Sequence, residues 1–150
     1  MATMTLRETI YSPEKRPALV ADCQRLLDSE VARKRGITGS VIKGAYKTVS
    51  KVKPGLIRGV LELLLGEWMD ELEADYQAFL ASDAHDTFGA YLLERKAEVA
   101  EVMLAVTDRR AARTSHKTAG KFYNRLRGGA KEQVIESLPA AAVVLDRHLA

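Results

Sequence analysis

The chain has 150 residues, of which 47% are hydrophobic and 29% are charged, and its formal net charge is +3. A chain of this length can bury a core of its own as one domain, and its low aromatic content disfavours a β-sandwich or a barrel. The single cysteine excludes an intramolecular disulfide and a cluster of thiolate metal ligands, so we expect a reducing, cytoplasmic location. The longest apolar stretch, from Gly55 to Met69, is interrupted by three charged residues, so we expect no membrane span.

The first half of the chain carries signals for three helices. Ser12 can cap a helix and Pro13 fits its first turn, after which apolar residues recur every three or four positions. Farther on, Pro54 pushes the residue before it out of the α region, which ends one helix and allows the next to begin. These signals predict an N-terminal tail over residues 1–12 and helices over about 14–34, 40–51 and 54–81.

The second half carries signals for three more helices, so the sequence predicts an all-α fold built as a single-domain bundle of about six helices. Asp83 and Asp86 mark a loop and can cap the fourth helix, and Gly128-Gly129 separates the fifth from the sixth. Pro139 is expected to kink or break the sixth helix, because proline removes a backbone hydrogen bond. Within a domain of residues 13–150, the predicted ranges are 87–106 with an extension as far as 113, 114–127 and 134–149.

One part of the chain resembles another part of it. When the sequence is shifted by 74 residues, half of a 22-residue window is identical or similar, and Lys43 and Gly55 fall on Lys117 and Gly129. Each predicted copy is a basic helix, a glycine break and an apolar helix. Amphipathic helices also resemble one another by chance, which is the alternative. A true duplication would divide the domain into three-helix halves, residues 13–82 and 83–150.

Three short phrases of the sequence resemble those of a known family. They are Ser12 to Pro17, Val52 to Gly55 and Ala105 to Ala111. The phrases are similar to ones that recur in a family of short, uncharacterised, all-helical bacterial proteins, and the likeness covers most of the chain. The resemblance implies a small helical protein, and it assigns neither a function nor a role to any residue.

Charge is divided along the chain into blocks of one sign. Residues 31–58 and 109–131 each hold eight Lys or Arg and no acid, whereas residues 62–86 hold eight Asp or Glu and no Lys or Arg. A surface of one sign attracts a partner of the opposite sign unless the fold neutralises it internally. Both outcomes stay open, and the preferred neutral outcome places the acidic side chains of residues 67–75 beside one of the basic helices.

Two basic stripes are the strongest candidate site, and a nucleic-acid backbone is the favoured partner. Their members stand at i, i+4 and i+8, so each trio lies along one side of its helix, about 6 Å apart per step. Like charges at this spacing repel one another by about a few tenths of a kcal/mol per pair, which a phosphate backbone would offset. A solvated face, pairing with the acidic block and an anionic lipid surface are the alternatives. The stripes are Lys43, Lys47 and Lys51, and Lys117, Lys121 and Arg125.

Aromatic residues near the stripes bear on the same hypothesis. Tyr46 borders the polar side of the second helix and can stack on an exposed base, whereas Phe122 and Tyr123 are expected to face inward. Because binding of single strands normally uses several stacking side chains, this scarcity favours contact with the backbone and no reading of sequence.

Basic residues also surround two predicted helix starts, near Pro54-Gly55 and near Gly128-Gly129. Free backbone N–H groups at a helix start suit an anion, so both loops are candidate phosphate sites. Ordinary turn chemistry is the alternative explanation of the glycines. The first loop adds Lys53 and Arg58 to the candidate residues, and the second adds Arg127.

Signals for catalysis or for a metal are weak. His85, His116 and His148 lack the i, i+4 spacing of helical metal ligands, and the loop around His85 lacks the ligand rhythm of a calcium site. Cys23 falls on the apolar arc of the first helix, which is a structural position. No phosphate-loop, dinucleotide-binding or nucleophile-elbow motif is present. We therefore expect no enzymatic activity, no cofactor and no metal ligands.

Three functions follow as expectations. The first is a non-enzymatic contact with RNA or DNA through the two basic stripes. The second is a homo-oligomer that seats another subunit on an extra apolar strip near Leu63 and Met69, with the charge blocks neutralised. The third is a helical pocket for an apolar small molecule, indicated by Leu64, Leu65 and Trp68.

Overall fold

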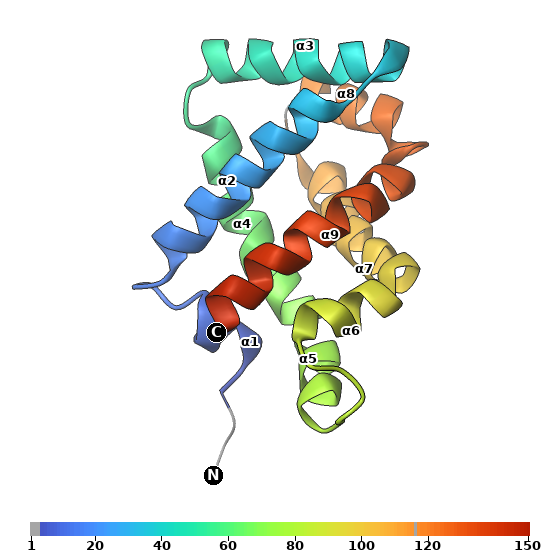
Figure 1. Cartoon of the computed structure of the whole chain (residues 1–150). Coiled ribbons are helices and arrows are strands. Elements are labelled where there is room, and N and C mark those ends of the chain that lie inside the picture. Colours follow the sequence, from blue (N-terminus) through green and yellow to red (C-terminus); the bar gives the residue numbers. More distant parts are fainter. Residues whose placement is uncertain (1–3, 116) are drawn as a thin grey trace.

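The computed structural model describes residues 4–115 and 117–150, apart from the side chains of Thr118, Ala119 and Phe122. The expectations for residues 1–3, for His116 and for the side chain of Phe122 lie outside the described residues. All regular structure in the described part is α-helical, so the all-α prediction is confirmed (Figure 1). The helices are α1 Leu6–Ile10, α2 Arg16–Arg33, α3 Gly36–Val52, α4 Leu56–Glu71, α5 Glu73–Leu80, α6 Phe88–Glu94, α7 Lys96–Arg113, α8 Lys117–Arg127 and α9 Ala130–Leu149.

The described ranges contain nine helices where about six were expected, because two predicted helices are each divided and α1 precedes the first predicted helix. The predicted helix 54–81 bends at Leu72, which separates α4 from α5 with a ψ of 0°. The predicted helix 87–113 is divided at Arg95, whose ψ is 27°. Neither position carries proline or glycine. Leu72 is only 3% exposed, so the bend places this leucine in the core while α5 turns its own Tyr76 inward.

The predicted N-terminal tail is wrong for residues 6–11. Thr5 and Glu8 form a reciprocal capping box, in which the Thr5 side chain accepts from the Glu8 N–H at 3.0 Å. Leu6 and Ile10 are 0% exposed, and the Tyr11 hydroxyl donates to the carbonyl oxygen of Glu62 at 2.6 Å. A helix of one turn is too short for apolar periodicity to reveal it, yet its side chains belong to the main core.

α9 continues through Pro139, where a kink or a break was expected. Pro139 is exposed, so its ring lies on the solvent side of α9. The opposite side of α9 packs against α2, α6 and α7. Leu138, Ala142 and Val144 are buried there.

Four helices surround the middle of the bundle. α2 and α7 each pack against both α4 and α9, and so hold those two helices on opposite sides of the interior (Figure 1). α3, which packs on α2 and α4, lies with α8 at one end of the molecule, and α1 and α5 lie toward the other. The two basic helices that the proposed duplication would align therefore share an end of the bundle, while the duplication itself stays a prediction.

Candidate functional site

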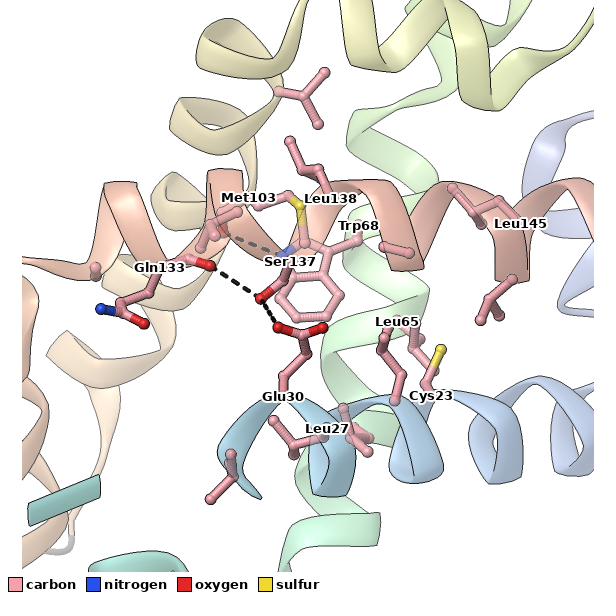
Figure 2. Close-up of a pocket in the computed structure, with 18 of the residues that line it drawn as sticks. Cys23, Leu27, Glu30, Leu65, Trp68, Met103, Gln133, Ser137, Leu138 and Leu145 are labelled. Atoms are coloured by element: carbon pink, nitrogen blue, oxygen red, sulfur yellow. Dashed lines mark hydrogen bonds between the residues drawn. The ribbon is translucent and has the colours of Figure 1, made fainter. Parts of the chain in front are cut away.

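An apolar cavity of about 420 Å³ lies between α2, α4, α7 and α9, and side chains from α3, α6 and α8 complete its wall. Its volume falls within the range of about 300–1,000 Å³ that is typical of small-molecule sites. Figure 2 shows side chains from α2, α4 and α9 converging on this space. Core residues among its lining include Leu61, Leu65, Met69, Leu138 and Val144.

Trp68 is fixed at the wall of the cavity. Its Nε1–H donates a hydrogen bond to the carbonyl oxygen of Met103 at 3.1 Å, which ties α4 to α7 and orients the indole ring. Of the three residues that indicated a pocket in the sequence, Leu65 and Trp68 line the cavity. Leu64 is half-buried and is not part of the lining. Because the chain has one tryptophan, its fluorescence reports on this cavity alone.

The Cys23 thiol also lines the cavity, on α2. Burial, and to a smaller extent the neighbouring Asp22 carboxylate, raise the pKa of this thiol to about 11. The thiol is therefore protonated near neutral pH, where it behaves as a small apolar group and is a poor nucleophile.

One carboxylate belongs to this largely apolar wall. Glu30 is 6% exposed, and its Oε1 accepts a hydrogen bond from Nη1 of Arg33 at 2.9 Å. Its Oε2 lies 3.4 Å from the Ser137 hydroxyl, but the same hydroxyl is 2.9 Å from the Gln133 carbonyl oxygen (Figure 2). A hydroxyl has one proton, and the shorter contact is the better hydrogen bond. Glu30 Oε2 is therefore an acceptor without a good donor.

The sequence pattern around Glu30 marks it as a buried acid, although Glu30 was not among the predicted site residues. Cys23, Leu27 and Glu30 stand at i, i+4 and i+7 of α2, so the carboxylate shares a face with apolar side chains. A buried carboxylate is costly unless it is paired, which makes an acid on an apolar face informative. A second acceptor of the same wall, Oε1 of Gln133, is buried and has no hydrogen-bond partner among the described atoms.

The cavity opens beneath α3 and α8. Among its lining residues, Thr38 and Gly129 are exposed, and they lie at the start of α3 and just before α9. Two shallow polar pockets adjoin this opening and are formed largely by the turn from α2 to α3. Lys34 borders the cavity and both shallow pockets. A basic side chain therefore lies where the cavity meets the two polar pockets.

Most of the predicted anion-binding residues are free at the surface. They are exposed, and within the described part of the chain none makes an ion pair or a side-chain hydrogen bond. Both stripes lie at one end of the molecule, and Ile42 of α3 and Leu126 of α8 line the same cavity (Figure 1). The free residues are Lys43, Lys47, Lys51 and Lys53, and Lys117, Lys121 and Arg125.

The other two predicted residues have partners within the protein. Arg58 lies 3.3 Å from Glu62 on the next turn of α4. Arg127 forms a bidentate pair with Asp108, at 2.9 and 3.2 Å. The Arg127 guanidinium, together with the Tyr123 hydroxyl, holds the pKa of the Asp108 carboxyl below its usual range. The helix-start loops therefore offer fewer free cations than the sequence indicates.

Within the described part of the chain, the carboxylates of residues 67–75 form no ion pair with α3 or α8, contrary to the preferred prediction. These carboxylates pair instead with arginines of α1, α7 and the turn before α7, because α4 and α5 pack against those elements. Arg109 and Arg110 are the first residues of the second basic block, so only the beginning of that block is neutralised in this way. The pairs are Asp70 with Arg7, Glu71 with Arg109, Glu67 with Arg110 and Asp75 with Arg95.

The tyrosines near the stripes face the protein. The Tyr46 hydroxyl donates to Asp28 of α2, and its burial and this carboxylate raise the pKa of the phenol. Tyr46 is therefore engaged between α2 and α3 and is a weaker stacking candidate than expected. Tyr123 is half-buried and bonds to Thr107 and Asp108, as its predicted inward position requires.

An apolar strip is exposed along α4. Leu63 is 56% exposed, Val60 45% and Leu56 42%, and these side chains continue from Val52, which is 70% exposed. The spacing of Leu56, Val60 and Leu63 by three or four residues places these three side chains on one side of α4. Met69, which was expected at the edge of such a strip, is 3% exposed and belongs to the core.

The described histidines have carboxylate neighbours. His85 contacts Glu94, and His148 lies 2.6 Å from Asp22, whose carboxyl pKa is lowered chiefly by that hydrogen bond. Across the described residues, no group of three or more His, Cys, Asp or Glu side chains is arranged to hold a metal ion. None of the described helices combines the length and the apolar character that crossing a membrane requires.

Comparison with known proteins assigns the chain to a family. The model of the family described as "Family of unknown function (DUF6918)" matches residues 6–149, which is nearly the whole chain, so the chain belongs to this family. No curated protein and no solved structure matches the sequence.

Proposed function

We propose that this family member is a non-enzymatic, cytoplasmic protein that binds an apolar small molecule in the cavity between α2, α4, α7 and α9. The observation that supports this proposal is the cavity itself, about 420 Å³ with an almost wholly apolar wall. Protein interiors are normally packed with few voids larger than a water molecule. An apolar cavity of this size is the usual form of a ligand site.

The energetics of an empty cavity support occupancy. At about 24 cal/mol per Å³ of enclosed void, an empty apolar space of this volume would cost at most about 10 kcal/mol, because the part that is open to solvent is not void. That cost is comparable to the whole stability of an ordinary domain, about 5–15 kcal/mol. Water gains little in a space with few polar partners. A ligand that fills the cavity would offset much of this cost.

Filling the cavity from within is expected to abolish binding. Ala141 lines the cavity, so the ring of Ala141→Phe would take the space of the ligand and lower the affinity for 1-dodecanol at least tenfold. Titration is followed by the fluorescence of Trp68, and native mass spectrometry of the purified protein detects a ligand carried from the cell. The matched control is Ala97→Phe on the exposed face of α7, which should bind as the wild type does. Equal binding by both variants would contradict the proposal.

The second candidate function is contact with RNA or DNA through the basic stripes of α3 and α8. What supports it is that the acidic block is neutralised by arginines of α1 and α7, leaving the stripe residues without ion pairs in the described structure. A row of unpaired cations binds a phosphate backbone through the release of counterions, without reading sequence.

Reversal of charge on α3 tests this second candidate. Lys43→Glu with Lys47→Glu is expected to lower the affinity for a nucleic-acid duplex about tenfold at low salt and to reduce the salt slope by about one per lost phosphate contact. Helicity measured by circular dichroism should not change, because both side chains are exposed. The control pair Lys15→Glu with Lys96→Glu makes the same charge change elsewhere. If the wild type bound no nucleic acid at low salt, this second candidate function would be contradicted.

Self-association through the exposed strip of α4 is a third candidate, supported by the exposure of Leu56, Val60 and Leu63. At high micromolar concentration, light scattering is then expected to give a mass above the 16.5 kDa of one chain. Leu63→Glu should return the mass to that of the monomer, whereas Leu80→Glu, at a leucine exposed to 46% elsewhere, should not. A monomeric wild type removes this candidate.

A further inference from the structure

The cavity changes in polarity from one end to the other. Toward α6 its wall is made of apolar side chains, among them Leu72, Leu92 and Val144. Toward α3 it meets the two shallow pockets, whose walls contain Arg33, Lys34 and their neighbours in the turn from α2 to α3. An apolar interior that ends at a polar opening fits a molecule with an apolar body and one polar end.

The charge at the opening is positive. The basic side chains that border the shallow pockets are Arg33, Lys34, Arg35 and Lys43, and the carboxylates are Glu30 and Glu136. Glu30 pairs with Arg33, and Glu136 lies 3.6 Å from Nζ of Lys34, so both carboxylates are already neutralised. Arg35 and Lys43 make no ion pair with any described residue. Two positive charges are thus left over, Arg35 in the pocket that adjoins the cavity most closely and Lys43 in the pocket beside it.

The length of the cavity indicates the shape of its ligand. Residues from Gly129 to Leu145 of α9 line it, and at about 1.5 Å of rise per residue this part of the chain extends for about 24 Å. On α2 the lining extends from Cys23 to Lys34, about 16 Å by the same rise. A volume of about 420 Å³ spread over such a length suits one extended chain better than a compact ring system.

We propose that the cavity binds a single-chain amphiphile, with its hydrocarbon chain lying along α9 and its anionic head, a carboxylate or a phosphate, held at the opening by Arg35 and Lys43. This inference rests on the proposed apolar site and adds the chemistry of the ligand. Arg33 and Lys34 shield the head from Glu30 and Glu136, with which they pair. The chain occupies the apolar part of the cavity beside Trp68.

Three probes with the same twelve-carbon chain test the inference: dodecanoate, dodecyl phosphate and 1-dodecanol. Each is titrated below its micelle concentration while the fluorescence of Trp68 is recorded. The two anionic probes are expected to bind about three- to tenfold more tightly than the alcohol at low salt, and the comparison between them distinguishes a carboxylate head from a phosphate head. Inorganic phosphate alone should leave the fluorescence unchanged.

Arg35→Gln with Lys43→Gln should reduce the affinity for the anionic probes to that for the alcohol and leave the alcohol unaffected. These side chains have no ion pairs within the described residues, so the double variant should keep the stability of the wild type. Lys47→Gln, on the same helix but outside the shallow pockets, is the control. Equal binding of all three probes by the wild type would overturn the inference and leave the apolar site standing. No response of Trp68 to any probe would overturn both.

Discussion

Replacing Leu6 and Ile10 by alanine is expected to lower the free energy of unfolding by about 4–10 kcal/mol, because each truncation of a fully buried leucine or isoleucine costs about 2–5 kcal/mol. Both side chains are 0% exposed and belong to the main core. A loss of this size approaches the whole stability of an ordinary domain, about 5–15 kcal/mol. The double variant should therefore be largely unfolded at moderate temperature.

Urea denaturation followed by far-ultraviolet circular dichroism measures this effect. The matched control is Met4→Ala, because Met4 precedes the same helix but is 54% exposed. That substitution should change the free energy of unfolding by less than about 0.5 kcal/mol. If Leu6→Ala with Ile10→Ala were as stable as the control, α1 would be a dispensable tail and its place in the core would be wrong.

Arg33→Ala is expected to destabilise the protein by about 3 kcal/mol, since it would leave the buried Glu30 carboxylate without its charged partner. Glu30→Leu should change the stability in the opposite direction. It removes the carboxylate, fills apolar space, and is expected to be neutral or to stabilise the protein by about 1–2 kcal/mol. The pair of variants separates the cost of a buried charge from the value of the ion pair.

Thermal and urea unfolding at neutral pH measure both changes. Arg35→Ala is the control, because Arg35 is exposed and lacks an ion pair in the described structure. Its expected effect is within about 0.5 kcal/mol. A large loss of stability in Glu30→Leu would show that this carboxylate supports the fold. A gain would show that the protein retains Glu30 at a cost to stability. Residues of functional sites commonly carry such a cost.

The sequence was sufficient for the fold class and for the long helices. Periodic apolar residues located α2, α3, α8 and most of α9, and Pro54 correctly separated α3 from α4. The bends at Leu72 and Arg95 were missed because neither position carries a residue that breaks helices. The bend at Leu72 places that side chain in the core, which local sequence does not reveal. α1 was missed because a single turn has no measurable periodicity.

Prediction of the candidate site was less complete. The exposure of Lys43, Lys47 and Lys51 could be predicted, because helical spacing alone tells which face is polar. The partners of the acidic block could not be predicted, because they depend on which helices become neighbours in space. The cavity could not be predicted either, because apolar residues that fill a core and apolar residues that line a cavity look alike in a sequence. Glu30, an acid on an apolar face, offered a signal for this site in the sequence, but it was not among the predicted residues.

The walls of the cavity come from distant parts of the chain. The contact between Glu30 and Ser137 spans 107 positions, and α9 closes a space whose opposite side is α4. The lining is therefore exposed until the last helix docks, and contacts between distant residues form slowly during folding. Until then the newly synthesised chain exposes an extended hydrophobic surface to solvent. Aggregation and chaperone capture should accordingly depend on how fast α9 docks, and a hydrocarbon ligand present during synthesis would favour recovery of soluble protein.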